Sequence, residues 1–209
     1  MIGEYIEIAG KRVSPFTIPS GIITTTPASL EKLAEEVPEL GISTIKSIGP
    51  EPRAGNNPPI LAQVTRGIPG DYINAVGLTN DGVDVTVEKL SRIHFPKNKV
   101  LVASVFAGSV EGFADVAVKL APYVDVAQGN ASCPHTEGHG IVFGMDPDLV
   151  ERVARTIVKR LRENGYDTPV DIKLTPLSDV RATGLAALRG GASILTAFNT
   201  HEPYCYEVD

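Results

Sequence analysis

The sequence predicts an α/β fold built on a parallel sheet, and three observations predict it. Short apolar, β-branched runs recur along the 209 residues, amphipathic helical patterns separate them, and polar residues follow the runs at a repeated position. Unbroken apolar strands that alternate with helices are typical of parallel sheets buried on both faces. About six such β-units can be counted, and we expect them to form one domain spanning residues 1–209.

The predicted strands are the short runs richest in Val, Ile and Thr. The first is a strand with its turn, and each of the others stands after a helical pattern or a loop. Their predicted ranges are 16–21, 43–47, 100–105, 124–128, 170–174 and 193–198. The segment between 47 and 100 is predicted mainly as a long loop.

The predicted helices begin with capping residues. Thr26 precedes Pro27, Ser109 precedes the second helical pattern, and Asp146 precedes Pro147, which are signals for a helix N-terminus. Apolar residues at helical spacing follow each cap, and a later helix contains two leucines. These positions are Leu30, Leu33 and Ala34; Phe113, Val116, Ala117 and Leu120; Val150, Val153, Ile157 and Leu161; and Leu185 and Leu188.

Six β-units fit either a doubly wound sheet or an incomplete eight-stranded barrel. Polar residues at or just past the ends of successive strands favour the barrel, because those ends converge on one rim where active sites are built. The predicted fold is therefore a parallel (β/α)8 TIM barrel lacking its last two β/α units. The rim residues are Ser20, Lys46, Ser104, Asn130, Lys173 and Asn199.

Composition and charge exclude several classes of function. The net charge of −6 gives no general attraction to nucleic acid. No apolar stretch approaches the roughly 18 residues that span a bilayer, and the first residues do not resemble an export signal. We therefore expect a cytoplasmic protein in which Cys133 and Cys205 are free thiols.

Cys133 is the most distinctive candidate for chemistry. It follows a predicted strand and precedes Pro134, in a glycine-rich loop. A thiol in that place could be a nucleophile, a general base, a metal ligand or a buried filler. Cys133, His135 and His139 offer only three zinc ligands, and so we predict no metal site.

The segment Asn130-Ala131-Ser132-Cys133-Pro134 resembles the signature of the dihydroorotate dehydrogenase family, in its soluble branch with a cysteine base. Further blocks resemble the family in the same order along residues 5–200. They are Pro19-Ser20-Gly21-Ile22, Ile45-Lys46-Ser47, Glu51 to Asn56, Asn74 to Asn80, Lys173-Leu174-Thr175-Pro176 and Phe198-Asn199-Thr200.

The resemblance implies an FMN-dependent oxidation of dihydroorotate to orotate in pyrimidine biosynthesis. Cys133 would take a proton from C5 of the pyrimidine while hydride passes from C6 to flavin N5. The implied FMN-binding residues are Ser20, Gly21, Lys46, Ser47, Asn130, Lys173 and Asn199. The implied substrate-binding residues are Lys46, Asn74, Gly77, Leu78, Asn130, Asn199 and Thr200. Homo-oligomers and an electron-transfer partner subunit are also implied.

Three features depart from the family pattern. His135 stands where asparagine is usual, and this resembles the pyrimidine-reducing domain of dihydropyrimidine dehydrogenase. Ser104 also replaces a frequent asparagine. The sequence stops at Asp209, after the sixth strand, and so the segments that hold the cofactor phosphate in such barrels are expected elsewhere. The alternatives are a pyrimidine-base dehydrogenase, an inactive barrel subunit and a transfer-RNA dihydrouridine synthase, which would need a basic surface.

Overall fold

A computed structural model describes residues 5–21, 23–63, 72–131 and 143–198. Six parallel strands form one sheet within these ranges, in the order β10-β9-β8-β7-β4-β3. Their bounds are β3 (Phe16–Ile18), β4 (Leu40–Thr44), β7 (Val100–Val105), β8 (Val126–Asn130), β9 (Val170–Lys173) and β10 (Ile194–Thr196). The sheet order follows the chain order.

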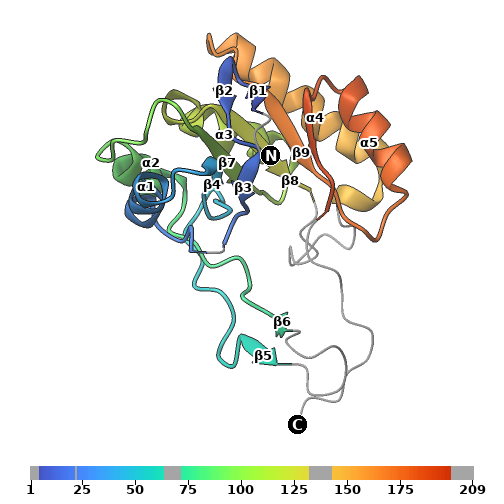
Figure 1. The fold of residues 1–209 in the computed structure, drawn as a ribbon. Helices are drawn as coiled ribbons and strands as arrows, with labels where there is room; N and C mark the ends of the chain where they lie inside the picture. Colours follow the sequence, from blue (N-terminus) through green and yellow to red (C-terminus); the bar gives the residue numbers. More distant parts are fainter. Residues whose placement is uncertain (1–4, 22, 64–71, 132–142, 199–209) are drawn as a thin grey trace.

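This order distinguishes the two folds that the sequence allows. A doubly wound sheet reverses its strand order at a switch point, where the chain returns to the first strand. Here every strand pairs with its neighbour along the chain, and all five pairings are parallel. The result is a curled sheet with helices on its outer face, which is a partial TIM barrel as predicted (Figure 1).

Three of the helices begin at the predicted capping residues. Thr26 accepts a hydrogen bond from Ser29 N at 3.1 Å, and Ser109 accepts one from Gly112 N at 3.1 Å. Asp146 does the same for Asp148 N at 2.8 Å. Such caps contribute about 1 kcal/mol each. The helices are α1 (Pro27–Glu36), α2 (Val83–Leu90), α3 (Val110–Leu120), α4 (Pro147–Glu163) and α5 (Val180–Arg189), with short 3-10 turns η1 (Ala121–Tyr123) and η2 (Phe143–Met145).

Side chains of the sheet alternate between two apolar cores. On β7, Leu101, Ala103 and Val105 pack into the large core beneath the helices. Val100 and Val102 point the other way and join a small core inside the curl. Because successive strand residues face opposite sides, Ser104 also lies on the inner face. The inside of the curl is therefore apolar at the amino ends of the strands and polar toward their carboxyl ends.

A short hairpin closes the amino end of the curl. It consists of β1 (Ile6–Ile8) and β2 (Lys11–Val13), and Val13 packs into the inner core. Lys11 Nζ lies 2.8 Å from the carboxylate of Asp125, which also accepts a hydrogen bond from Leu101 N at 2.9 Å. The pair anchors the hairpin to the sheet, on the side opposite the rim.

Several elements differ from the sequence prediction. The second strand of the sheet is Leu40–Thr44 rather than 43–47, and the fourth is Val126–Asn130 rather than 124–128. The predicted loop between 47 and 100 contains α2 and an antiparallel hairpin of β5 (Leu61–Gln63) and β6 (Tyr72–Asn74). The N-cap of α2 is Gly82, which makes no side-chain cap bond, and so the usual start signal is absent.

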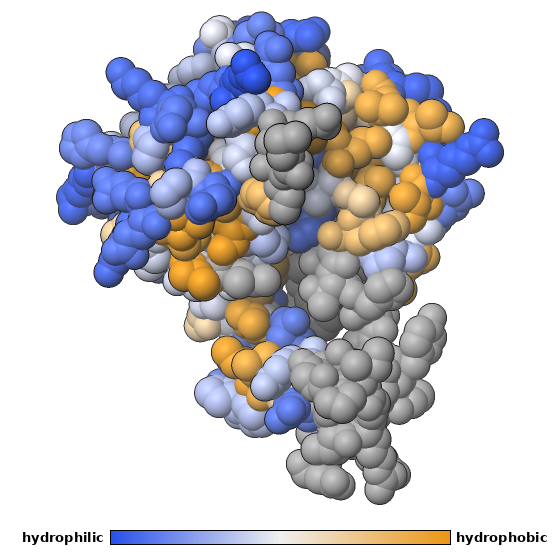
Figure 2. Space-filling model, viewed as in Figure 1, coloured by the Kyte–Doolittle hydropathy of each residue, from blue (hydrophilic) through white to orange (hydrophobic). Residues whose placement is uncertain are grey.

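Helix α5 packs against the rest of the domain through small residues. Its buried positions are Thr183, Gly184, Ala186 and Ala187, whereas Leu185 and Leu188 are 49% and 46% exposed. Figure 2 shows apolar surface on the side of the molecule where α5 lies. No helix in the described part of the chain is long and apolar enough to cross a membrane.

Glu151 of α4 joins α4 to α5, and this contact predicts a pH-dependent stability. Its carboxylate binds Arg155 on the same helix and Arg189 Nε of α5 at 2.9 Å. Hydrogen bonds from Arg189 and Arg155 lower the pKa of Glu151 below its ordinary value. Its contribution to stability should therefore be present above about pH 4.3, the unfolded value, and should disappear as pH falls through the lower folded pKa.

We expect Glu151→Gln to lower the urea midpoint at pH 7, because it removes the carboxylate that binds the two arginines. Near pH 3 the difference from the unmodified chain should shrink, because the carboxylate becomes protonated there. Glu163→Gln is the matched control, because Glu163 makes one exposed pair, with Lys159, on the same helix. An equal effect of both substitutions at pH 7 would contradict the prediction.

Candidate functional site

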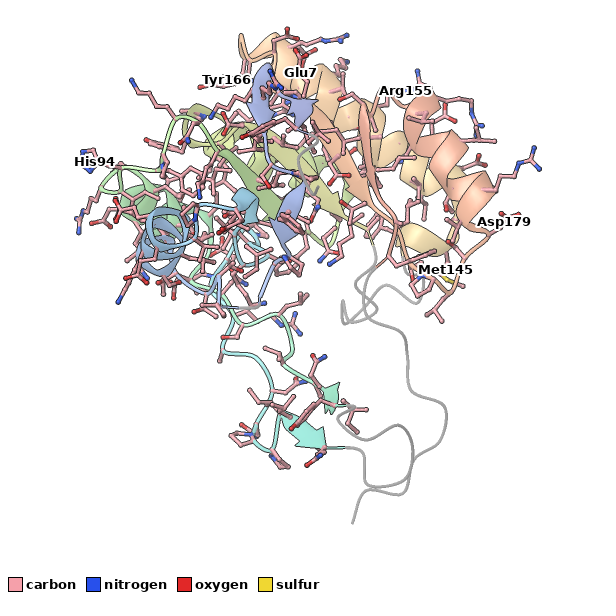
Figure 3. The ribbon with its side chains drawn as sticks, viewed as in Figure 1. Glu7, His94, Met145, Arg155, Tyr166 and Asp179 are labelled. Atoms are coloured by element: carbon pink, nitrogen blue, oxygen red, sulfur yellow. The ribbon has the colours of Figure 1, made fainter. Side chains whose placement is uncertain are left out.

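The carboxyl ends of the strands form one rim, and the labelled residues of Figure 3 identify it. Met145 and Asp179 precede α4 and α5, at the end of the molecule where strands give way to helices. Glu7 and Tyr166 lie at the opposite end, with the β1–β2 hairpin. In parallel barrels the rim at the carboxyl ends is where active sites are found.

A chain of hydroxyl and amide groups crosses this rim. Ser47 Oγ lies 3.2 Å from Ser20 Oγ and 2.8 Å from Ser104 Oγ. It also accepts a hydrogen bond from Asn130 Nδ2 at 3.2 Å. Ser20 and Ser47 follow β3 and β4, Asn130 ends β8, and Ser104 is the last residue but one of β7. The structure therefore brings together predicted site residues that are up to 110 positions apart in the sequence.

The side-chain oxygen of Asn130 is available to accept a hydrogen bond from a ligand. The residue is 5% exposed, and its Oδ1 accepts no hydrogen bond within the described residues. A buried amide oxygen without a donor costs free energy, and such atoms are commonly satisfied by a ligand or water. Asn130 is thus suited to accept a bond from a polar molecule on the rim.

Two predicted lysines also stand at the rim. Lys173 is the last residue of β9 and is 8% exposed, while Lys46 follows β4 and is half-buried. Gly21 has a φ of +91°, and a Cβ there would contact Lys46 Cδ at 3.8 Å. The first turn and Lys46, both implied by the resemblance as cofactor-binding residues, therefore lie side by side.

A second polar group lies beneath the rim and was not predicted from the sequence. Gln128 Nε2 donates to Asp171 Oδ2 at 2.7 Å and to Thr196 Oγ1 at 3.0 Å. Thr196 Oγ1 donates to the same Asp171 oxygen at 2.6 Å. Burial raises the pKa of Asp171, and the bonds from Gln128 and Thr196 and the charge of Lys173 oppose that rise. Polar residues two apart, Gln128 with Asn130 and Asp171 with Lys173, were the available signal.

The loop after β6 is held by backbone-directed contacts. Arg53 pairs with Asn80 in a short bridge, and Arg53 Nε donates to Gly77 O at 2.9 Å. Gly77 and Leu78 both have positive φ, +75° and +58°. The predicted substrate-binding pair thus has a fixed, left-handed backbone.

Of the other predicted site residues, one is not brought to the rim and the rest lie outside the described residues. Asn74 is exposed at the end of β6, in the hairpin that Figure 1 shows apart from the sheet. Cys133, His135, His139, Asn199 and Thr200 lie outside the described residues. Within the described ranges, no three His, Cys, Asp or Glu side chains form a group able to hold a metal ion.

The rim fits a polar, planar cofactor by the chemistry of its donors. It offers hydroxyls, two lysines and an amide whose oxygen accepts no hydrogen bond from the described residues, above a curl whose amino end is apolar. A flavin ring carries carbonyl and nitrogen atoms on an apolar body, and these groups match both parts of the rim.

Comparison with known proteins agrees with the sequence resemblance. The family model described as dihydroorotate dehydrogenase matches residues 6–204. The chain is 37% identical over 190 residues to "Dihydroorotate dehydrogenase B (NAD(+)), catalytic subunit" of Pyrococcus horikoshii, covering 90% of the chain and 58% of that protein. It is 34% identical to the protein of the same name in Methanocaldococcus jannaschii, covering 90% and 59%.

A solved structure gives the same result for the fold. Ligand-free DHODH from Eimeria tenella superposes with a TM-score of 0.74 at 18% identity, covering 94% of the chain and 62% of that structure. The chain thus spans about three fifths of the length of the relatives that it matches.

Gly77 provides a test of the loop geometry. A Cβ at Gly77 would lie 2.7 Å from Asn56 Cγ and N, and its φ is +75°. We expect Gly77→Ala to lower the free energy of unfolding by more than the roughly 1–2 kcal/mol of left-handed strain alone.

Gly10→Ala is the matched control for Gly77→Ala. Gly10 has a similar φ of +71°, and a Cβ there would meet no atom within 4 Å. Urea denaturation of both variants separates the strain from the close contact. Equal losses in the two variants would show that the Gly77–Asn56 contact is unimportant.

Proposed function

Because the chain belongs to the dihydroorotate dehydrogenase family, we propose that the whole protein oxidises dihydroorotate to orotate with FMN. The observation that carries the proposal is the rim itself. Ser47 joins hydroxyl and amide groups from four strands, and Lys173 ends the next strand of the same sheet. This set of donors suits a flavin ring and a planar pyrimidine acid.

The proposed FMN site lies along the rim. The residues that would hold the cofactor are Ser20, Gly21, Lys46, Ser47, Asn130, Lys173 and Asn199. Lysine ammonium groups beside a flavin ring stabilise negative charge that develops during electron transfer. The chemistry supplied by bound FMN is two-electron acceptance, with flavin N5 receiving the hydride that leaves C6 of the substrate.

The proposed substrate site adds the loop after β6 and two residues beyond β10. The residues that would bind the pyrimidine are Lys46, Asn74, Gly77, Leu78, Asn130, Asn199 and Thr200. Cys133 is the proposed general base, removing a proton from C5 of the pyrimidine. Amides offer both donors and acceptors, and so they match the fixed polar pattern of such a ring.

An electron-transfer partner also belongs to the proposal. The two archaeal relatives are named as catalytic subunits of an NAD(+)-linked dihydroorotate dehydrogenase B. Such a name implies a further subunit in those proteins. We infer that this protein likewise passes electrons from its flavin to a partner subunit.

Cofactor binding is the first test of this function. We expect the purified chain, after addition of FMN and gel filtration, to retain absorption bands in the visible blue. Lys173→Met should weaken retention at least about tenfold, because it removes a cation from the site. Lys119→Met is the control, because Lys119 makes an exposed pair with Asp84 on the outer helices. A chain that stays colourless would favour an inactive barrel subunit.

Cys133 is the test of the mechanism. We expect Cys133→Ser to slow dihydroorotate oxidation by about 10²–10⁴-fold at neutral pH, since a serine hydroxyl is a far weaker base. Cys205→Ser, which removes the other thiol, should keep the rate. A full rate in Cys133→Ser would exclude the cysteine base.

Parallel assays with dihydrouracil address the substrate. His135 resembles the corresponding residue of the pyrimidine-reducing enzymes. Turnover of dihydrouracil without turnover of dihydroorotate would make a pyrimidine base the substrate and exclude dihydroorotate.

A further inference from the structure

The inner face of β9 carries two ionisable side chains. Asp171 and Lys173 are two residues apart and therefore point to the same side of the sheet. They are 3% and 8% exposed. Val170, which precedes them, and Ile172, which lies between them, pack into the large core beneath the helices. A buried charge is costly unless an opposite charge or hydrogen bonds compensate it. The two residues must therefore be understood together.

The contacts of Asp171 are those of an acceptor. Gln128 Nε2 at 2.7 Å and Thr196 Oγ1 at 2.6 Å both donate to Oδ2. Gln128 also donates to Thr196 Oγ1 at 3.0 Å, so that the threonine oxygen accepts there and its one hydroxyl proton is donated to the carboxylate. A carboxylate that only accepts is in the role of its ionised form. Its Oδ1 is buried and receives no hydrogen bond within the described residues.

Lys173 is the cation on the same face of β9 as this carboxylate. Burial raises the pKa of Asp171, and the hydrogen bonds from Gln128 and Thr196, together with the attraction of Lys173, oppose that rise. The inner-face residues of the neighbouring strands are uncharged, namely Gln128 and Asn130 on β8 and Thr196 on β10. Lys46, after β4, is the other ionisable side chain assigned to the rim within the described residues. One buried anion thus stands beneath a rim that carries two cations.

A purely structural role does not explain the charge. Asparagine has the same shape as aspartate, and its oxygen could accept the bonds from Gln128 and Thr196 without the cost of burying an anion. What aspartate adds is a negative charge on the same face of β9 as Lys173.

We propose that Asp171 is a positioning residue for Lys173, supplying the buried counter-charge that keeps the Lys173 amine protonated and oriented toward the rim. The proposal rests on the proposed function, because the orientation of Lys173 matters there for holding FMN. Gln128 and Thr196 fix the carboxylate from the strands on either side. Asp171 itself lies beneath the cofactor position and acts through Lys173.

The first experiment tests the pairing without any cofactor. Urea midpoints are measured at pH 7 for Asp171→Asn, Lys173→Met and the double variant. If the two charges stabilise each other, the double variant keeps a higher midpoint than the sum of the single shifts predicts. Asp125→Asn combined with Lys173→Met is the control and should be additive, because Asp125 pairs with Lys11 at the other end. Additivity in the Asp171–Lys173 cycle overturns the proposal.

The second experiment measures FMN affinity against pH by fluorescence quenching. Without its anion, Lys173 gives up its proton more easily, and so Asp171→Asn should lose affinity about one pH unit lower on the basic side than the unmodified chain. Asp125→Asn should follow the unmodified chain, and in the Lys173→Met background Asp171→Asn should no longer move the basic side of the curve. Coincident curves for Asp171→Asn and the unmodified chain overturn the proposal.

The two experiments separate the proposal from the function on which it rests. If the unmodified chain binds no FMN at any pH, the proposed function fails, and the denaturation cycle alone decides the pairing. Should Asp171→Asn fail to fold, Asp171→Thr takes its place in both experiments, since threonine is uncharged and suits a strand. Circular dichroism identifies that case before either measurement.

Discussion

The hydrogen bonds of one buried hydroxyl, Ser47 Oγ, organise the carboxyl rim of this domain. Ser20, Ser104 and Asn130 all lie within 3.2 Å of it, and together they belong to four neighbouring strand ends. Backbone pairing already joins the strands at this point, since Ser104 pairs with Gln128, Asn130 pairs with Lys173, and Ile48 forms a bridge with Val105. Ser47 adds side-chain bonds across the same strand ends. The rim is therefore held in a defined geometry before any ligand arrives.

The rim and the core of the curl meet opposite demands. Toward the amino ends, Val100, Val102 and Val126 fill the interior with Val13 from the hairpin. Toward the carboxyl ends, the same strand faces carry Ser104, Gln128 and Asn130. Burial of the apolar half stabilises the domain, whereas burial of the polar groups in the other half costs free energy and leaves a surface that can bind a polar ligand. This division along each strand allows one small sheet to serve both purposes.

Much of this arrangement could be predicted from local patterns, and the exceptions have physical reasons. Thr26, Ser109 and Asp146 start helices through their own side chains, so that the signal is local. Helix α2 starts at Gly82 without a side-chain cap, and it was predicted as loop. The rim residues were predicted because their position after each strand is visible in the sequence. The Gln128–Asp171–Thr196 group was not, because it depends on register between strands 25 and 43 residues apart.

That polar group also has a mechanical consequence for the end of the sheet. Strand β10 has only three ladder residues, Ile194–Thr196, and they pair on one side with β9. A strand so short could slip by one residue, and a slip of one residue turns every side chain to the opposite face. The bonds of Thr196 to Asp171 and Gln128 can form in only one alignment. The buried carboxylate therefore fixes the register of β10, and with it which side chains of that strand face the inside of the curl.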